Sequence, residues 1–139
     1  MNPKKIVLDT DVILEHVTRN REMRSRRKSL MREAMLKCFC YTTVFNVIEL
    51  FALCETEKQE RTMEHVLGAL KVLGLNGKSG KSLGSIIRRA RRDEGRDLDA
   101  LIGGLCLESK LPLLTGRRRS YRGIRGLRLL SSREIAKIA

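Results

Sequence analysis

The chain has 139 residues, of which 42% are hydrophobic, so it is long enough to bury one sizeable core and too short to suggest two domains. Lys and Arg number 29 against 16 Asp and Glu, and the formal charge of +13 favours a polyanion as partner. No apolar run approaches the roughly 20 residues that span a bilayer, and the first residues resemble no signal peptide. We therefore expect one domain over residues 1–139, without a membrane partner, in the cytoplasm.

Cysteine and histidine are scattered along the sequence. There is no CxxC pair, whereas a structural zinc site needs closely paired thiolates. We expect reduced, buried thiols and assign no metal role to either histidine. The residues concerned are Cys38, Cys40, Cys54, Cys106, His16 and His65.

The first third of the chain begins with a short apolar run. Residues 6–8 are Ile, Val and Leu, which predicts a parallel strand buried on both faces, with Asp9 at its carboxyl end. A helix should follow from about Val12. Between residues 18 and 37 apolar side chains recur near helical spacing among many arginines. This pattern predicts an amphipathic, strongly basic helix or a pair of helices.

The segment from residue 43 to 53 is apolar apart from Asn46 and Glu49, which predicts a second helical region. Thr42 or Thr43 could cap its amino end. A lone glutamate in so apolar a helix is costly unless its carboxylate is paired or binds a cation.

The middle of the chain predicts three more helices, with a loop after the first. A helix is expected over residues 58–70, and a short strand or turn over 73–75. Residues 74–84 are rich in Gly, Ser and Lys, which predicts a surface loop, although their glycine spacing does not match a phosphate-binding loop. Residues 85–92 predict a basic helix, and a charged turn then leads to a helix over 98–109.

The last third predicts two more strands. Residues 111–114 should form a buried strand that ends at Thr115, and 116–125 a very basic loop. A strand near residues 127–130 and a short capped helix end the chain. Alternating strands and helices imply an α/β fold whose parallel sheet is covered on both faces. Such sheets place their sites at the carboxyl ends of strands, where Asp9 and Thr115 are expected.

Three acids interrupt apolar surroundings, namely Asp9, Glu49 and Asp99. Taken singly they could be a turn residue, a side chain that reaches solvent and a helix cap. Carboxylates gathered in one cleft repel one another, so a cluster normally needs a divalent cation, and Mg²⁺ or Mn²⁺ suits oxygen ligands. An acidic pocket with a basic surround therefore predicts metal-dependent hydrolysis of a nucleic-acid phosphodiester.

Four segments, in order, resemble the PIN domain of VapC toxins, a small metal-dependent ribonuclease fold. Residues 6–11 resemble its opening strand followed by Asp-Thr-Asn or Asp-Thr-Asp, and 43–50 resemble its second motif with a metal-binding Glu. Residues 99–115 resemble its third Asp with the helix and strand that follow. The ending is similar at Tyr121, Ile124, Gly126 and Leu127.

This resemblance implies a PIN-like three-layer α/β/α sandwich with a central parallel sheet. It implies that Asp9, Glu49 and Asp99 bind Mg²⁺ or Mn²⁺, with Asp97 as an auxiliary acid and Thr115 close to the attacking water. These three ligands and Thr115 would form the catalytic set of a ribonuclease. The resemblance also implies a homodimer and a cognate antitoxin that blocks the site, often with a basic side chain.

The sequence departs from the family after Thr115. The family often has Asn or Asp two positions later, and an acid or His just before the aromatic residue, where this chain has Arg117 and Ser120. Either one metal suffices and arginines grip RNA phosphates, or the chain is a catalytically weakened RNA-binding or protein-interaction module. The predicted RNA contacts are Arg117, Arg118, Arg119, Arg88, Arg89, Arg91 and Arg92, although a solvated loop is an equal alternative for the first three.

A haloacid-dehalogenase type of phosphatase is the rival enzyme class. Asp9 and Asp11 at a strand end could then act as nucleophile and general acid, with Thr115 on a later strand. That family expects Thr or Val two positions after the second Asp, where Ile13 stands, and further acids after the threonine strand. The ribonuclease prediction explains the positive charge better.

Overall fold

A computed structural model gives the fold and describes residues 4–22, 28–92 and 96–139. Its centre is a five-stranded parallel sheet of order β3-β2-β1-β4-β5. The strands are β1 (Lys5–Leu8), β2 (Phe39–Thr43), β3 (Lys71–Leu73), β4 (Leu113–Leu114) and β5 (Leu129–Leu130). The register places Val7 of β1 opposite Tyr41 on one side and Leu113 on the other, so β1 is the central strand. The predicted α/β class with a parallel sheet is confirmed.

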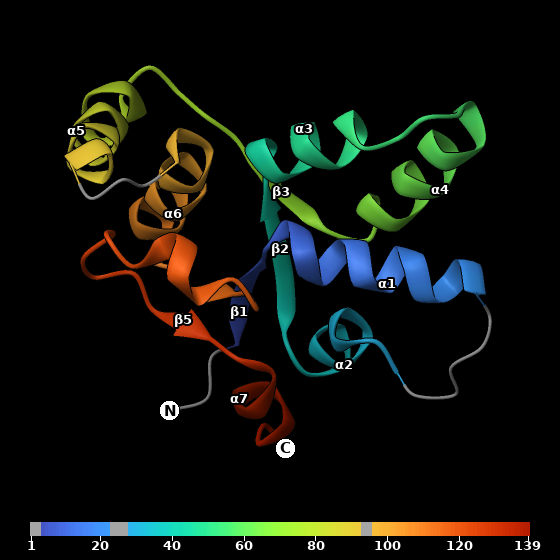
Figure 1. Ribbon diagram of the computed structural model, residues 1–139. Helices are drawn as coiled ribbons and strands as arrows, with labels where there is room; N and C mark the ends of the chain where they lie inside the picture. The colour runs from blue at the N-terminus through green and yellow to red at the C-terminus, as the bar shows by residue number, and fades with distance from the viewer. Residues whose placement is uncertain (1–3, 23–27, 93–95) are drawn as a thin grey trace.

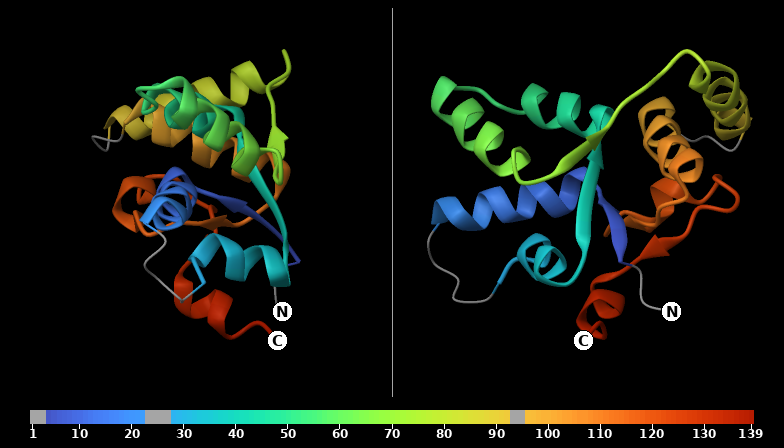
Figure 2. Two further views of the ribbon diagram at one scale, coloured as in Figure 1. Left: turned by 90° about the vertical axis from the view of Figure 1, so that its right-hand side faces the viewer. Right: turned by 180° about the vertical axis from the view of Figure 1, so that it is seen from behind.

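Helices cover both faces of this sheet (Figure 1). They are α1 (Thr10–Glu22), α2 (Leu30–Lys37), α3 (Val44–Ala52), α4 (Glu57–Leu67), α5 (Ser79–Arg92), α6 (Asp97–Ser109) and α7 (Ser132–Ala136), with a 3-10 helix η1 (Arg118–Tyr121). Figure 1 shows α5 and α6 on one side of the sheet and α1, α2 and α4 on the other, and the view from behind in Figure 2 agrees. The arrangement is the predicted three-layer sandwich.

Alternation along β1 divides the core in two. Ile6 and Leu8 pack with residues of α1, α2, α3, α4 and α7, whereas Val7 packs with residues of α6 and η1. All three side chains are completely buried. A strand buried on both faces must be apolar throughout, which is the pattern from which β1 was predicted.

Three local predictions differ from the structure. β2 was not predicted as a strand. The loop predicted for residues 74–84 is wrong in its second half, because α5 already begins at Ser79. The basic loop predicted for residues 116–125 contains η1. The predicted basic helix or helix pair over 18–37 corresponds to the end of α1 and to α2, and residues 23–27 lie outside the described part of the chain.

The early start of α5 has a physical cause. The side chain of Asn76 accepts hydrogen bonds from the backbone N–H groups of Lys78 (2.9 Å) and Ser79 (3.2 Å), so it caps the incoming turn. The Ser79 hydroxyl then donates to Glu108 of α6 at 2.8 Å. Gly104 of α6 has no side chain, which leaves room for Leu83 of α5. Packing against α6 thus compensates for the low helix propensity of the glycines in α5.

Two expectations from composition can be compared with the described residues. None of the helices over 4–22, 28–92 and 96–139 is long and apolar enough to cross a bilayer. The four cysteines are free thiols, as expected, but only Cys106 is fully buried, and Cys38, Cys40 and Cys54 are half-buried. Burial raises the pKa of the Cys106 thiol to about 12, which keeps it protonated and unreactive at neutral pH.

Candidate active site at the carboxyl edge of the sheet

Asp9 lies where β1 ends and α1 begins, and it is completely buried. Its Oδ1 accepts hydrogen bonds from the backbone N–H of Thr10 (2.8 Å) and from Nδ2 of Asn46 (3.1 Å). Its Oδ2 accepts from the hydroxyl of Thr115, which follows β4, at 2.7 Å. Three neighbouring segments at one edge of the sheet therefore fix this carboxylate, as the parallel topology predicts.

Asn46 is a site residue that the sequence did not assign. Thr43 caps α3, as predicted, and shares a capping box with Asn46, whose Oδ1 accepts from the Thr43 backbone N–H at 3.2 Å. With its carbonyl oxygen thus engaged, the amide nitrogen of Asn46 turns to Asp9 and to the Thr10 hydroxyl (3.0 Å). The signal in the sequence was a polar amide inside an otherwise apolar helix start.

Asp99 and Glu49 approach the same place from two helices. Asp99 lies in the first turn of α6 and is 1% exposed. Its Oδ2 is 3.2 Å from Nε of Arg96, and Nη2 of Arg96 is 3.7 Å from Oε2 of Glu49 in α3. The other oxygen of Glu49, Oε1, is buried and has no hydrogen-bond partner. Asp97, the predicted auxiliary acid, is exposed in the same turn of α6.

Arg117 joins the carboxylates. Its Nη2 lies 3.3 and 3.1 Å from the two oxygens of Asp9 and 3.1 Å from Oδ1 of Asp99. The same nitrogen is 3.1 Å from the Tyr121 hydroxyl, and the guanidinium stands over the Tyr121 ring, 5.6 Å from its centre. The structure thus links the three predicted acids in a chain of ion pairs, Asp9 to Asp99 through Arg117 and Asp99 to Glu49 through Arg96.

The electrostatics of this cluster keep both Arg117 and Tyr121 protonated. Burial alone would lower the pKa of Arg117, but the charges of Asp9 and Asp99 raise it well above its usual value. Burial raises the pKa of Tyr121, and Asp9 raises it further. The site therefore contains a permanent cation beside a neutral phenol.

Asp11 holds the chain that follows β4. Its Oδ2 accepts a hydrogen bond from the backbone N–H of Gly116 at 2.8 Å, and a Cβ at Gly116 would come within 2.8 Å of the same oxygen. Burial raises the pKa of Asp11, the Gly116 N–H lowers it, and the nearby Asp9 raises it. Asp11 therefore ties the start of α1 to the turn that follows β4.

The other predicted RNA contacts lie on the surface. Arg118 and Arg119 are exposed in η1, and Nη1 of Arg118 is 3.9 Å from Oε1 of Glu134. Arg88 and Arg89 are exposed on α5. The side chains of Arg91 and Arg92, also in α5, lie outside the described part of the structure. Only Arg117 among the described members of this predicted set turns into the acidic site.

The donor set can be tested against a divalent cation. Carboxylate oxygens are the ligands that Mg²⁺ and Mn²⁺ prefer, and the unpartnered, buried Oε1 of Glu49 is an acceptor that such an ion would satisfy. The geometry is less favourable to a metal, because the described residues contain no group of three or more acids, histidines or cysteines spaced to hold one. Arg117 stands between Asp9 and Asp99 instead. The ligand types at the site suit a divalent cation, but the guanidinium of Arg117 occupies part of the space that the cation would need.

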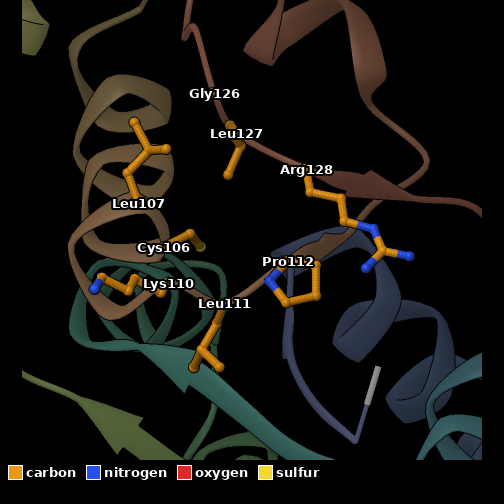
Figure 3. A pocket seen from close by; sticks show the side chains of 8 residues that line it. All are labelled: Cys106, Leu107, Lys110, Leu111, Pro112, Gly126, Leu127 and Arg128. Carbon is orange, nitrogen blue, oxygen red and sulfur yellow. The ribbon is translucent and has the colours of Figure 1, made fainter. Parts of the chain in front are cut away.

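A separate cavity of about 360 Å³ lies at the opposite edge of the sheet, where β4 begins (Figure 3). It is lined by Cys106, Leu107, Lys110, Leu111, Pro112, Gly126, Leu127 and Arg128. None of these belongs to the predicted catalytic or nucleic-acid-binding sets, and the only thiol among them is the protonated Cys106. The cavity takes no part in the acidic site.

Comparison with known proteins gives a clear result for the fold. No protein-family model and no curated sequence matches the chain. Among solved structures, VapBC2 from Rickettsia felis bound to a promoter DNA fragment matches with a TM-score of 0.72 at 12% identity, over 91% of this chain and 98% of that one. DNA-bound VapBC from Salmonella typhimurium matches with a TM-score of 0.71 at 20% identity, over 95% and 99%.

A third similar structure is VapBC-5 from Mycobacterium tuberculosis, described as a member of the VapBC family of toxin-antitoxin systems. It matches with a TM-score of 0.59 at 14% identity, over 93% of this chain and 98% of that one. At such low identity the likeness establishes the fold. The chain therefore has the PIN-like fold of VapC toxins, as the sequence resemblance predicted.

Proposed function

We propose that this chain is a divalent-metal-dependent endoribonuclease that hydrolyses RNA phosphodiesters. The observation that carries the proposal is the chain of ion pairs that links Asp9, Asp99 and Glu49 through Arg117 and Arg96, in a PIN-like fold. Burying such acids is costly unless cations compensate them. The unpartnered Oε1 of Glu49 supports a cation beyond the two arginines.

In this proposal Asp9, Glu49 and Asp99 would hold Mg²⁺ or Mn²⁺, with Asp97 as an auxiliary acid. When bound, such an ion activates a water molecule and offsets the charge that develops on the phosphate. Thr115 fixes the rotamer of Asp9 through its 2.7 Å hydrogen bond, and we place its hydroxyl close to the attacking water. Asn46 orients the other oxygen of Asp9.

RNA is the proposed substrate because the chain is strongly basic, with a formal charge of +13. Arg118 and Arg119 follow the acidic site directly and are exposed, so they are available to phosphates that approach it. Arg88 and Arg89 on α5 would extend the contact. In this arrangement the backbone of the nucleic acid is bound electrostatically, whereas the acids carry the chemistry.

We further propose that the chain is the toxin of a toxin–antitoxin pair, that it forms a homodimer, and that it acts on RNA in the cytoplasm. The support is the similarity in fold to chains of VapBC complexes, of which VapBC-5 is described as a toxin–antitoxin system. A cognate antitoxin would then be the natural protein partner.

A second candidate is a catalytically weakened RNA-binding or protein-interaction module. The position of Arg117 favours it, because the guanidinium already compensates Asp9 and Asp99 without a metal. Arg117 also stands where the family often has Asn or Asp, so this chain lacks a further acid of the family. The two candidates differ in whether the protein cleaves RNA, which a direct assay decides.

The test is cleavage of a mixed RNA by the purified chain in Mg²⁺, in Mn²⁺ and in EDTA. We expect cleavage with either ion and none in EDTA. Glu49→Gln should lower the rate at least about 100-fold, since it removes a ligand charge. Glu64→Gln, an exposed glutamate of α4, is the matched control and should cleave like the wild type. RNA binding without cleavage under any condition would favour the module.

A further inference from the structure

We propose that Arg117 is the resident cation of the acidic site. Its guanidinium occupies the place between Asp9 and Asp99 that a divalent ion needs. Arg117 therefore sets the metal concentration at which the site binds an ion. The metal half of this proposal rests on the function proposed above. The structural half, that Arg117 compensates the buried acids, stands on the geometry alone.

The distances show why the two cations exclude each other. A single nitrogen of Arg117 is within 3.3 Å of both oxygens of Asp9 and 3.1 Å from Oδ1 of Asp99. Mg²⁺ would need oxygens of the same two carboxylates at about 2.1 Å. An ion so placed would lie against the guanidinium with like charge, where repulsion at short range is strong. Metal binding therefore requires Arg117 to move.

Uncharged groups hold the side chain of Arg117 between Asp9 and Asp99. Its backbone N–H donates to the Thr115 hydroxyl at 2.9 Å, and that hydroxyl donates in turn to Asp9. The guanidinium rests over the buried ring of Tyr121 and is within 3.1 Å of its hydroxyl. The position two residues after Thr115 is thus built to receive a cation from the chain itself.

Arg117 can also leave. Its side chain is 28% exposed, whereas that of Asp9 is completely buried, so the guanidinium borders solvent at the mouth of the site. An exposed cation there has water and RNA phosphates as alternative partners. The side chain can exchange between the acids and the outside without unfolding the core.

The two arginines compensate the negative charge of the acids only in part, so a metal ion can still bind favourably. The carboxylates of Asp9, Asp99 and Glu49 are paired with two guanidiniums, those of Arg117 and Arg96, so these five groups together carry a formal charge of one negative. Arg96 is 62% exposed, and Oε1 of Glu49 has no partner at all. An ion that binds Oε1 of Glu49 would satisfy an acceptor that neither arginine satisfies. Arg117 therefore acts as a competitor for metal, with an affinity that ion concentration can overcome.

The experiment compares the intact chain with Arg117→Met, which keeps the length and the contact with Tyr121 but loses the charge. Arg122→Met, at an exposed arginine directly after η1, is the matched control. Calorimetric titration with Mn²⁺ gives the affinity, and melts in EDTA and in Mn²⁺ give the stability. Neither readout depends on RNA cleavage.

We expect Arg117→Met to melt about 5–10 °C lower than the wild type in EDTA, because two buried carboxylates lose their shared cation. In saturating Mn²⁺ the two melting temperatures should draw together, because the variant binds Mn²⁺ at least about tenfold tighter and so gains more stability from the ion. Arg122→Met should match the wild type in both. Arg117→Lys keeps the charge without the planar guanidinium and should bind Mn²⁺ with an affinity between those of wild type and Arg117→Met. The Lys variant also serves if Arg117→Met fails to fold.

The outcomes separate the two proposals. Equal Mn²⁺ binding by wild type, Arg117→Met and Arg117→Lys overturns the role of Arg117 and leaves the metal-dependent function standing. No Mn²⁺ binding by any of the three overturns the metal-dependent function, and with it the competition. Tight binding by Arg117→Met beside weak binding by the wild type supports both.

Discussion

Asp99→Asn perturbs the site with the least change in shape, and the structure determines the sign of its effect on stability. Repulsion among carboxylates without a metal would predict that losing one charge stabilises the protein. The structure predicts the opposite, because both oxygens of Asp99 are paired, Oδ1 with Arg117 at 3.1 Å and Oδ2 with Arg96 at 3.2 Å. An asparagine keeps one acceptor and points an N–H₂ donor at the other guanidinium.

The size of the loss follows from burial. Removing one partner of a fully buried ion pair costs about 3–5 kcal/mol. Arg117 is 28% exposed, which reduces this figure, and Arg96 is 62% exposed, so its pair adds at most about 1 kcal/mol. We therefore expect Asp99→Asn to lower the free energy of unfolding by about 2–4 kcal/mol at pH 7 without metal. For a chain of this length the melting temperature should fall by about 6–15 °C.

The assay is urea unfolding and thermal melting in EDTA, with Asp97→Asn as the control. Both changes remove one acid from the first turn of α6, so the effect of the helix dipole is common to both and amounts to about 0.3–1 kcal/mol. Only Asp99 is buried between the arginines. If Asp99→Asn melts at or above the wild type, the arginines do not compensate the acids, and the reasoning for the resident cation fails with it.

Two other substitutions test the surroundings of the site. Asp11 has a raised pKa in the folded protein, so its contribution to stability is present at low pH and is lost as pH rises through that pKa. Asp11→Asn should therefore gain stability relative to the wild type between pH 4 and 7, as measured by urea unfolding. A disadvantage that grows with pH would contradict this. Arg119→Ala should weaken RNA binding and lower the slope of log K against log salt concentration by about 0.7–1. Arg61→Ala on α4, which is also exposed, should change neither the binding nor the slope. Equal slopes for both variants would make Arg119 an ordinary solvated side chain.

The central strands were predictable because burial on both faces leaves a readable pattern. Residues 6–8 and 113–114 are apolar without interruption, and each run ends at a polar residue, Asp9 or Thr115, that enters the site. Two parallel strands next to each other then place those polar residues at one edge. The meeting of Asp9 and Thr115 follows from local pattern and topology alone.

β2 lacked such a pattern. Its sequence from Phe39 to Thr43 mixes aromatic, thiol and hydroxyl side chains, and its burial increases along the strand from an exposed Phe39 to a buried Thr43. Thr42 is also completely buried, because its hydroxyl donates to the backbone carbonyl of Leu8 at 3.0 Å. A threonine buried by a long-range hydrogen bond looks like a turn residue in the sequence. The strand is therefore a product of tertiary pairing rather than of local preference.

The direction of Arg117 was unpredictable for a different reason. Three identical residues follow one another from 117 to 119, yet Arg117 turns to Asp9 and Asp99, Arg118 lies 3.9 Å from Glu134, and Arg119 is exposed. What separates them is the hydrogen bond from the Arg117 backbone to Thr115 and the turn of η1 that follows, neither of which composition encodes. A positive charge counted in the sequence can bind a polyanion or compensate the protein's own buried acids. In this fold Arg117, the first arginine after the threonine strand, compensates buried acids. The run of three arginines therefore overstates by one the cations that face outward at this loop.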